Sequence, residues 1–217
     1  MVDKDHILTV LRIHFQIDNS PIVTDDPRIT EIYDDGSVDI NGNVRMIRPA
    51  GGRIPVRFNM VDGWFQAERM SLSSLENCPN FCGSLFVAQN NLRSLDYAPS
   101  YLGSLDISRN RFNNFVGLPE TVSVLSAHNN PLTSLDGLPQ EPPSEDPLTV
   151  EITYSPRLPL LRLLVAEEIE IRDPRDSNRR FEPIQTILNT YAGQGSAGAF
   201  ACGAELASAG FKENARW

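Results

Sequence analysis

The sequence predicts an α/β repeat fold: a solenoid of short parallel strands with a cap at each end. Three columns of residues that recur every 20 positions support this prediction. The leucine column is Leu75, Leu95, Phe115 and Leu135; the proline column is Pro79, Pro99, Pro119 and Pro139; the asparagine column is Asn90, Asn110 and Asn130. Such a fixed period is the signature of architectures in which each unit buries its apolar face against its neighbours.

The central repeat has the pattern Leu102-x-x-Leu105-x-Ile107-x-x-Asn110-x-Phe112. The repeats beginning at Cys82 and Val122 follow the same pattern. This pattern resembles the leucine-rich repeat, and three tandem matches make the resemblance specific. The resemblance implies parallel strands that line a concave face.

The asparagine column has a physical explanation. After the two inward residues of a strand, the chain turns and leaves backbone N–H and C=O groups away from water. A buried carboxamide both donates and accepts, so it can serve its own coil and an adjacent one. We therefore expect Asn90, Asn110 and Asn130 to form a structural ladder; the preceding repeat departs from the pattern with Met70.

The expected boundaries are an N-terminal cap over residues 1–43, the solenoid over residues 44–158, and a C-terminal helical cap over residues 159–217. Residues 7–15 fit a helix or a strand equally well, and residues 34–42 predict turn, strand, turn. Residues 140–147 (QEPPSEDP) are predicted to be a loop where a five-residue insertion lengthens the repeat. Helical spacing of apolar residues over 181–191 and 197–204 predicts two helices.

The segments LPLLRLLVA, ILNTYAGQGSAGAF and FKENARW, with DDGSVDINGNV near the N-terminus, are similar to leucine-rich-repeat proteins encoded by tailed bacteriophages. The resemblance covers most of the chain from about residue 33. It implies a phage protein of no established activity, located in the cytoplasm of the bacterial host or associated with the virion.

Composition excludes several classes of partner. The formal net charge of -9 comes without a basic stripe, which argues against nucleic acid as a partner. No apolar run is long enough to span a membrane. Residues 1–6 contain two acids where a secretory signal would carry bases, so we expect the cytosol as the compartment.

No motif points to a cofactor, a metal or an enzyme. Gly193, Gly195 and Gly198 match a dinucleotide-binding fingerprint, but a helical pattern precedes them and no second strand follows, so a helix–helix turn is expected. Cys78 and Cys82 lack the further cysteine or histidine pair that a zinc site needs, and we expect both to be buried.

The concave face is the predicted protein-binding surface, because residues that alternate with inward leucines point out of the sheet. Its predicted contact residues are Trp64, Gln66, Glu68, Arg69, Phe86, Gln89, Asp106, Arg109, Ser126 and His128. Trp64 and Phe86 beside arginines have the composition of an interface hot spot. The alternative for both rings is that a cap or loop covers them.

The predicted function is recognition of a host or phage protein through this face. The first alternative is a structural virion or assembly component whose C-terminal helices make the contacts. The second is an enzyme with a deep cleft lined by Glu167, Glu168 or Glu205.

Overall fold

The computed structural model describes residues 3–143 and 146–217; Ser144 and Glu145 of the predicted loop lie outside the described residues. The chain divides into two compact units. Unit 1 comprises residues 3–106 with Pro119–Thr121, and unit 2 comprises Ile107–Leu118 with Val122–Trp217.

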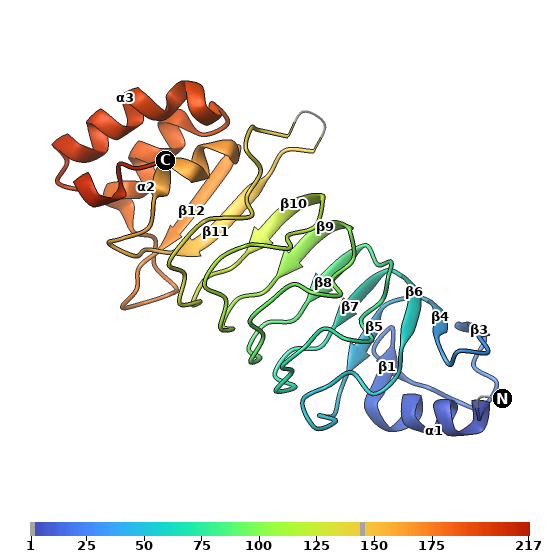
Figure 1. The fold of residues 1–217 in the computed structure, drawn as a ribbon. Helices are drawn as coiled ribbons and strands as arrows, with labels where there is room; N and C mark the ends of the chain where they lie inside the picture. The colour runs from blue at the N-terminus through green and yellow to red at the C-terminus, as the bar shows by residue number, and fades with distance from the viewer. Residues whose placement is uncertain (1–2, 144–145) are drawn as a thin grey trace. The chain divides into compact units, whose positions relative to one another are not determined.

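The main sheet of unit 1 has the strand order β9-β8-β7-β5-β1-β2 (Figure 1). Its strands are β1 (Phe15–Ile17), β2 (Ser20–Pro21), β5 (Val44–Met46), β7 (Trp64–Gln66), β8 (Ser84–Phe86) and β9 (Tyr101–Asp106). The pairings from β5 to β9 are parallel, whereas β1 is antiparallel to β2 and to β5. Trp64 lies opposite Ser84 and Ser84 opposite Ser104, so the 20-residue period is the register of the sheet.

A second sheet in unit 1 contains β3 (Ile29–Ile32), β4 (Val38–Asn41) and β6 (Phe58–Asp62). Strand β4 is antiparallel to β3 and parallel to β6. The helix α1 (Lys4–His14) precedes both sheets, and the Asp3 side chain accepts a hydrogen bond from the backbone of His6 at its N-terminus. The apolar stretch over residues 7–15 is therefore a helix that runs into β1.

Unit 1 has an aromatic cluster in its core and a close approach between neighbouring coils. Phe15, Phe58 and Phe65 pack together, with Phe58 5.2 Å from each of the other two rings in edge-on geometry. A Cβ atom added to Gly83 would lie 3.3 Å from the carbonyl oxygen of Gly63, which leaves little room for a side chain. Glycine therefore lets neighbouring coils approach closely at this position.

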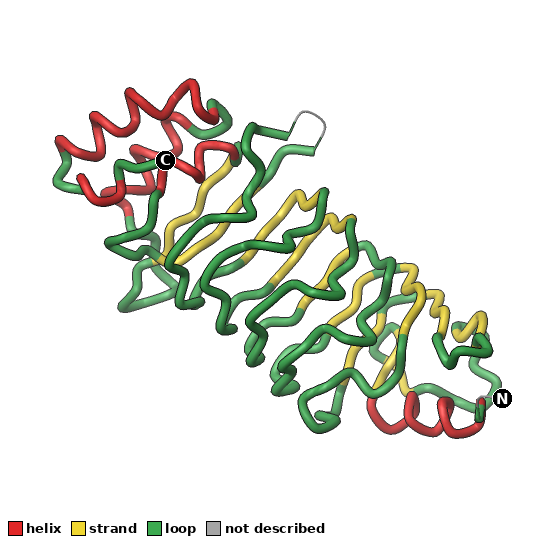
Figure 2. The backbone as a smooth tube through the Cα atoms, viewed as in Figure 1, coloured by secondary structure: helices red, strands yellow, loops and turns green. Residues whose placement is uncertain are grey.

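Unit 2 contains the parallel strands β10 (Thr121–Ser126, whose first residue belongs to unit 1), β11 (Thr149–Thr153) and β12 (Glu168–Arg172). Its helices are η1 (Leu160–Val165), α2 (Glu182–Tyr191), α3 (Gly195–Ser208) and η2 (Lys212–Asn214). Figure 2 shows short strands (yellow) joined largely by loops (green) in the repeat region. Ser126 pairs with Glu151, 25 residues later, which matches the 20-residue period plus the five-residue insertion.

Strand β12 was not predicted: it lies within residues 159–217, where a C-terminal helical cap was expected. Residues 168–172 alternate buried isoleucines with outward charged residues, which is the period of a strand. Gln185 of α2 completes the backbone hydrogen bonding of β12: it accepts from the N–H of Ile171 at 2.6 Å and donates to the carbonyl of Ile169. The other helical predictions are confirmed, because α2 ends at Tyr191 and α3 begins at Gly195 with the glycine-rich turn between them.

The repeat-like β-solenoid with mostly parallel strands confirms the predicted α/β repeat at this level. Within residues 3–143 and 146–217, no helix is both long and apolar enough to cross a membrane.

Candidate functional site

Asn90 links two coils of unit 1 through its side-chain amide. Its Oδ1 accepts hydrogen bonds from the N–H groups of Met70 and Leu72, each at 2.9 Å. Its Nδ2 donates to the carbonyl of Ala67 at 2.7 Å and to that of Val87 in its own coil at 2.9 Å. One buried side chain thus satisfies backbone groups on both coils.

Asn130 has the same arrangement in unit 2. Its Oδ1 accepts from the N–H of Phe112 at 3.0 Å, while Nδ2 donates to the carbonyls of Ile107 and Ala127 at 2.9 and 3.0 Å. Asn110 is buried and donates to the carbonyls of Ile107 and Ser108. These bonds hold the turns that follow the strands.

Met70 stands where the ladder would need another asparagine, and β1 pairs antiparallel with β5 in the coil before it. The N–H of Ile47 in the preceding coil donates to the carbonyl of His14, at the C-terminal end of α1, at 2.7 Å. The last turn of α1 thus supplies a polar partner to this coil.

The candidate site in unit 1 is the cluster of Arg45, Trp64, Gln66 and Phe86, called here the aromatic patch. All four side chains are half-buried on the outward side of β5, β7 and β8. The rings of Trp64 and Phe86 pack edge-on with centroids 6.4 Å apart, and the Arg45 guanidinium lies 5.7 Å from the centre of a Trp64 ring. Arg45 also donates to Gln66 Oε1 at 2.6 Å, so each member contacts another.

A hollow of about 420 Å³ lies beside the aromatic patch. It is lined by Arg45, Met46, Ile47, Gln66, Glu68, Arg69 and Met70. Arg69 is exposed and donates to Gln89 Oε1 at 2.9 Å, and Asp106 continues the row that contains Gln66 and Phe86. Within unit 1, the predicted residues therefore supply an aromatic centre with charged and amide groups around it.

The column Arg69, Gln89, Arg109 and Asn129 follows the strands and has left-handed backbone, with φ values of 58°, 58°, 54° and 57°. Non-glycine residues adopt this region infrequently because Cβ meets the following backbone. The chain therefore turns at each of these residues, and strand alternation alone does not give the direction of their side chains. Arg109 is exposed, and its backbone N–H donates to the carbonyl of His128 at 2.8 Å.

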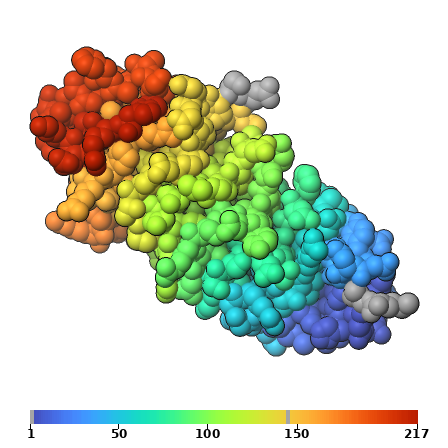
Figure 3. Space-filling model, viewed as in Figure 1, coloured from blue at the N-terminus to red at the C-terminus, as the bar shows by residue number. Residues whose placement is uncertain are grey.

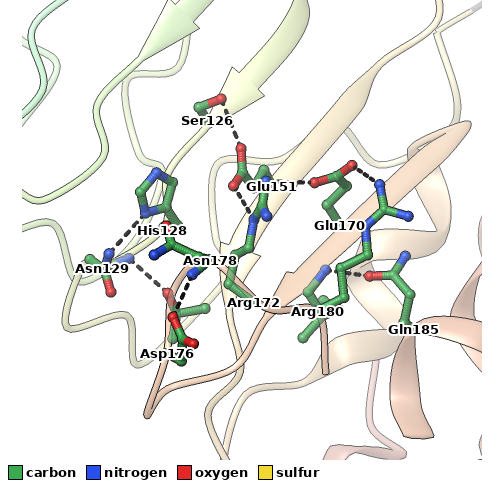
Figure 4. Close-up of polar contacts among 12 residues, drawn as sticks. Ser126, His128, Asn129, Glu151, Glu170, Arg172, Asp176, Asn178, Arg180 and Gln185 are labelled. Atoms are coloured by element: carbon green, nitrogen blue, oxygen red, sulfur yellow. Dashed lines mark hydrogen bonds and ion pairs between the residues drawn. The ribbon is translucent and has the colours of Figure 1, made fainter. Parts of the chain in front are cut away.

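In unit 2 the equivalent outward rows form a polar network, shown in Figure 4. Ser126 donates to Glu151 at 3.2 Å, and Arg172 pairs with Glu151 at 2.5 Å and with Glu170 at 2.9 Å. Arg180 adds a pair with Glu170 at 2.6 Å. Glu151 and Glu170 lie opposite one another in the β11–β12 register, so Arg172 offsets their repulsion.

His128 belongs to a separate small group in unit 2. Its Nδ1 lies 2.9 Å from Nδ2 of Asn129, and the Asn129 backbone N–H donates to the Thr153 hydroxyl at 2.8 Å. These contacts fix the turn after β10. The outward polar residues of β10, β11 and β12 are thus largely engaged with one another, whereas the centre of the aromatic patch is hydrophobic.

A row of exposed apolar residues in unit 1 was not predicted from the sequence: Met60 in β6, Phe81 before β8, and Tyr101, the first residue of β9. Phe81 and Tyr101 are 62% and 55% exposed, and Met60 bridges to Phe81. A hollow of about 480 Å³ beside Phe81 is lined also by Tyr97, Arg57 and Asn80. The 20-residue spacing from Phe81 to Tyr101 was the signal that could have revealed this row.

The three glutamates considered for an enzyme do not form a common cleft. Glu167 lines a hollow of about 290 Å³ with prolines and Gln194, whereas Glu168 is exposed on β12 and Glu205 accepts a hydrogen bond from the Tyr191 hydroxyl at 3.0 Å. This bond raises the pKa of Tyr191. Among the described residues, no group of three or more His, Cys, Asp or Glu has the geometry to hold a metal ion.

Cys78 and Cys82 are buried, as expected, and so is Cys202; all three thiols are free. Burial raises the pKa of Cys82 to about 12 and that of Cys202 to about 11. Burial also raises the pKa of Cys78 well above its usual value. These thiols therefore remain protonated at neutral pH, which disfavours them as nucleophiles or metal ligands.

Comparison of the chain with protein-family models, with curated proteins and with solved structures yields no match.

Proposed function

We propose that the chain is a leucine-rich-repeat module that binds another protein through the aromatic patch. The observation that carries the proposal is the contact of Trp64 with both Phe86 and Arg45 on an outward strand face. Interface hot spots are enriched in tryptophan, tyrosine and arginine that cluster near the centre of the contact. The patch offers two such side chains in one contiguous group.

The patch is preorganised, which supports a role in recognition. Trp64 is held between Phe86 and Arg45, and Arg45 is fixed in turn by Gln66 at 2.6 Å. Side chains that are already ordered lose less conformational entropy on binding. The neighbouring hollow of about 420 Å³, with Glu68 and Arg69 on its wall, can receive an apolar side chain that carries a polar end.

The test is affinity capture from a bacterial lysate with the wild type and the Trp64→Ala/Phe86→Ala variant, followed by mass spectrometry. The sequence resemblance to phage-encoded proteins motivates a bacterial source. A Phe81→Ala/Tyr101→Ala variant is the matched control, because it removes two exposed aromatic rings of unit 1 outside the patch. We expect a protein that the wild type and the control retain and the patch variant loses.

The proposal fails if the patch variant, shown to be folded by circular dichroism, retains the same proteins as the wild type. It also fails if the wild type retains no protein that is absent from a bare-resin control.

A structural role for the C-terminal helices is the second candidate, and one observation favours it. Phe200 on α3 is 91% exposed, beside a hollow lined by Leu161, Ala199, Gly203, Ala204 and Ala215. Figure 3 shows the C-terminal segment, drawn in red, at the surface of unit 2. Loss of an assembly contact in Phe200→Ser, with no effect of the patch variant, would favour this candidate over recognition by the aromatic patch.

A further inference from the structure

Strand β3 is an open edge of the second sheet in unit 1. Within the described residues it pairs with β4 and with no other strand. On β4, the N–H of Val38 donates to the carbonyl of Arg57 at 3.0 Å, on the side of the sheet where β6 lies. Ile32 lies opposite Val38 in the antiparallel register. Because the N–H of Val38 points away from β3, the two residues form a non-hydrogen-bonded pair, and the backbone N–H and C=O of Ile32 point to the open edge.

A hollow of about 250 Å³ follows this edge. All four residues of β3 line it, together with Lys4 and Leu8 of α1 and with Asp25 and Asp26. Consecutive side chains of a strand point to opposite faces, so a hollow bordered by all four residues lies along the edge and not over one face. A strand added at this edge would therefore lie in the hollow between β3 and Leu8 of α1.

The charge of the border determines which kind of strand fits. Asp25 and Glu31 are exposed and take part in none of the ion pairs found among the described residues, whereas Asp26 is neutralised by Arg28 at 2.7 Å. Lys4 provides a base on the same border, and acids outnumber bases over residues 3–41. The border is therefore acidic, and an added strand with lysine or arginine side chains complements it.

We propose that the β3 edge binds an extended, basic peptide segment of a partner protein by strand addition. Backbone hydrogen bonds to Ile32 would supply the directionality, and Asp25 and Glu31 would select the charge. A second copy of this chain fits less well, because antiparallel pairing of two β3 strands brings together two copies of the same acidic segment. The regular pairing with β4 shifts between Ile29 and Glu31, so the contact is centred on residues 31–33.

The first test uses labelled peptides and fluorescence anisotropy with the full chain. The probe is acetyl-Lys-Thr-Lys-Val-Lys-Thr-Lys-amide. One control peptide replaces each lysine with glutamate, and a second keeps the lysines but carries an N-methyl group on every residue, so that it cannot donate backbone hydrogen bonds. We expect the probe to bind and each control to bind at least about tenfold more weakly, a loss of about 1.4 kcal/mol or more.

The second test uses charge-reversed variants. Asp25→Lys and Glu31→Lys should each weaken probe binding, whereas Asp96→Lys, an equal charge change at an exposed position outside the hollow, should change it by less than about twofold. The Trp64→Ala/Phe86→Ala variant should bind the probe as the wild type does, which separates this proposal from the function proposed for the aromatic patch.

Equal binding of the N-methylated peptide would overturn strand addition, because charge attraction alone would then explain the affinity. Failure of the probe to bind, or formation of a dimer in sedimentation that Ile32→Pro abolishes, would overturn the assignment of a basic partner.

Discussion

At the residue scale, single polar side chains hold the backbone where regular secondary structure leaves it unpaired. Asn90 makes five such bonds, to the backbone of Ala67, Met70, Leu72, Val87 and Ala88. Asp26 is buried at 5% exposure and accepts from the backbone of Val23 and Arg28 as well as from the Arg28 guanidinium. A polar side chain is needed at both positions because each forms hydrogen bonds with backbone groups.

Asn90→Ala should lower the free energy of unfolding by about 3 kcal/mol, because it leaves several backbone groups without a partner and each costs about 1–3 kcal/mol when it remains buried. Chemical denaturation measures the change. The adjacent Asn91→Ala is the control: the Asn91 side chain donates a long, exposed hydrogen bond of 3.4 Å to the carbonyl of Ser71, so a loss below about 1 kcal/mol is expected. Equal losses would contradict the ladder.

Asp26 makes a pH-dependent contribution to stability. Hydrogen bonding from Arg28 lowers the pKa of Asp26 from 3.8 to about 2. Because the folded-state pKa is below the unfolded one, the stabilisation is fully present above about pH 4 and is lost as pH falls through 2. Asp26→Asn should cost about 2 kcal/mol at pH 7.

Urea denaturation between pH 2 and pH 7 tests this effect. The difference in the free energy of unfolding between the wild type and Asp26→Asn should decrease as the pH falls. The free energy of unfolding of Asp25→Asn, a change at an exposed neighbour, should stay close to that of the wild type at every pH. A difference in the free energy of unfolding that does not change with pH would show that the charge of the Asp26 carboxylate does not stabilise the fold.

At the element scale, α2 completes the backbone hydrogen bonding of β12. Gln185 accepts from Ile171 and donates to Ile169, and Asn189, one helical turn later, accepts from the N–H of Ile169 at 3.1 Å. The spacing of four residues places both amides on one face of the helix. Two side chains therefore take the place of a further strand and protect the edge from pairing with other chains.

Gln185→Leu keeps the size of this side chain but removes both of its hydrogen bonds to β12. The expected loss is about 2–4 kcal/mol in the free energy of unfolding, together with faster amide exchange at Ile171. Gln194→Leu, at an exposed position, should leave exchange at Ile171 unchanged. Unchanged protection in Gln185→Leu would mean that the edge of β12 does not need α2.

At the scale of the whole chain, the 20-residue period predicted the buried columns of the repeats and the register of β7, β8 and β9, because parallel coils repeat the same contact. The period did not predict β12, since the irregular spacing after the insertion breaks the columns. The Glu151–Arg172–Glu170 network could not be predicted from the sequence for the same reason. Residues 7–14 belong to the helix α1, which begins after the Asp3 cap, a signal that apolar spacing does not detect.

The candidate site was predictable only in part. Alternation along the strands placed Trp64, Gln66 and Phe86 on one face, but Arg45 was missed because its coil has no asparagine and departs from the repeat. The β3 edge carries no repeat signal at all. Both gaps arise from contacts between segments that lie far apart in the sequence.

The measurement that tests the central claim most directly is the dissociation constant of the captured partner for the wild type, Trp64→Ala, Phe86→Ala, the double variant and the Phe81→Ala/Tyr101→Ala control. We predict that each patch variant weakens binding by about 2 kcal/mol, or about thirtyfold. The double variant should lose less than the sum of the two, because the rings contact each other. Dissociation constants within about twofold of the wild type for all patch variants, with a loss only in the control, would contradict the account and move recognition to the row of Phe81 and Tyr101.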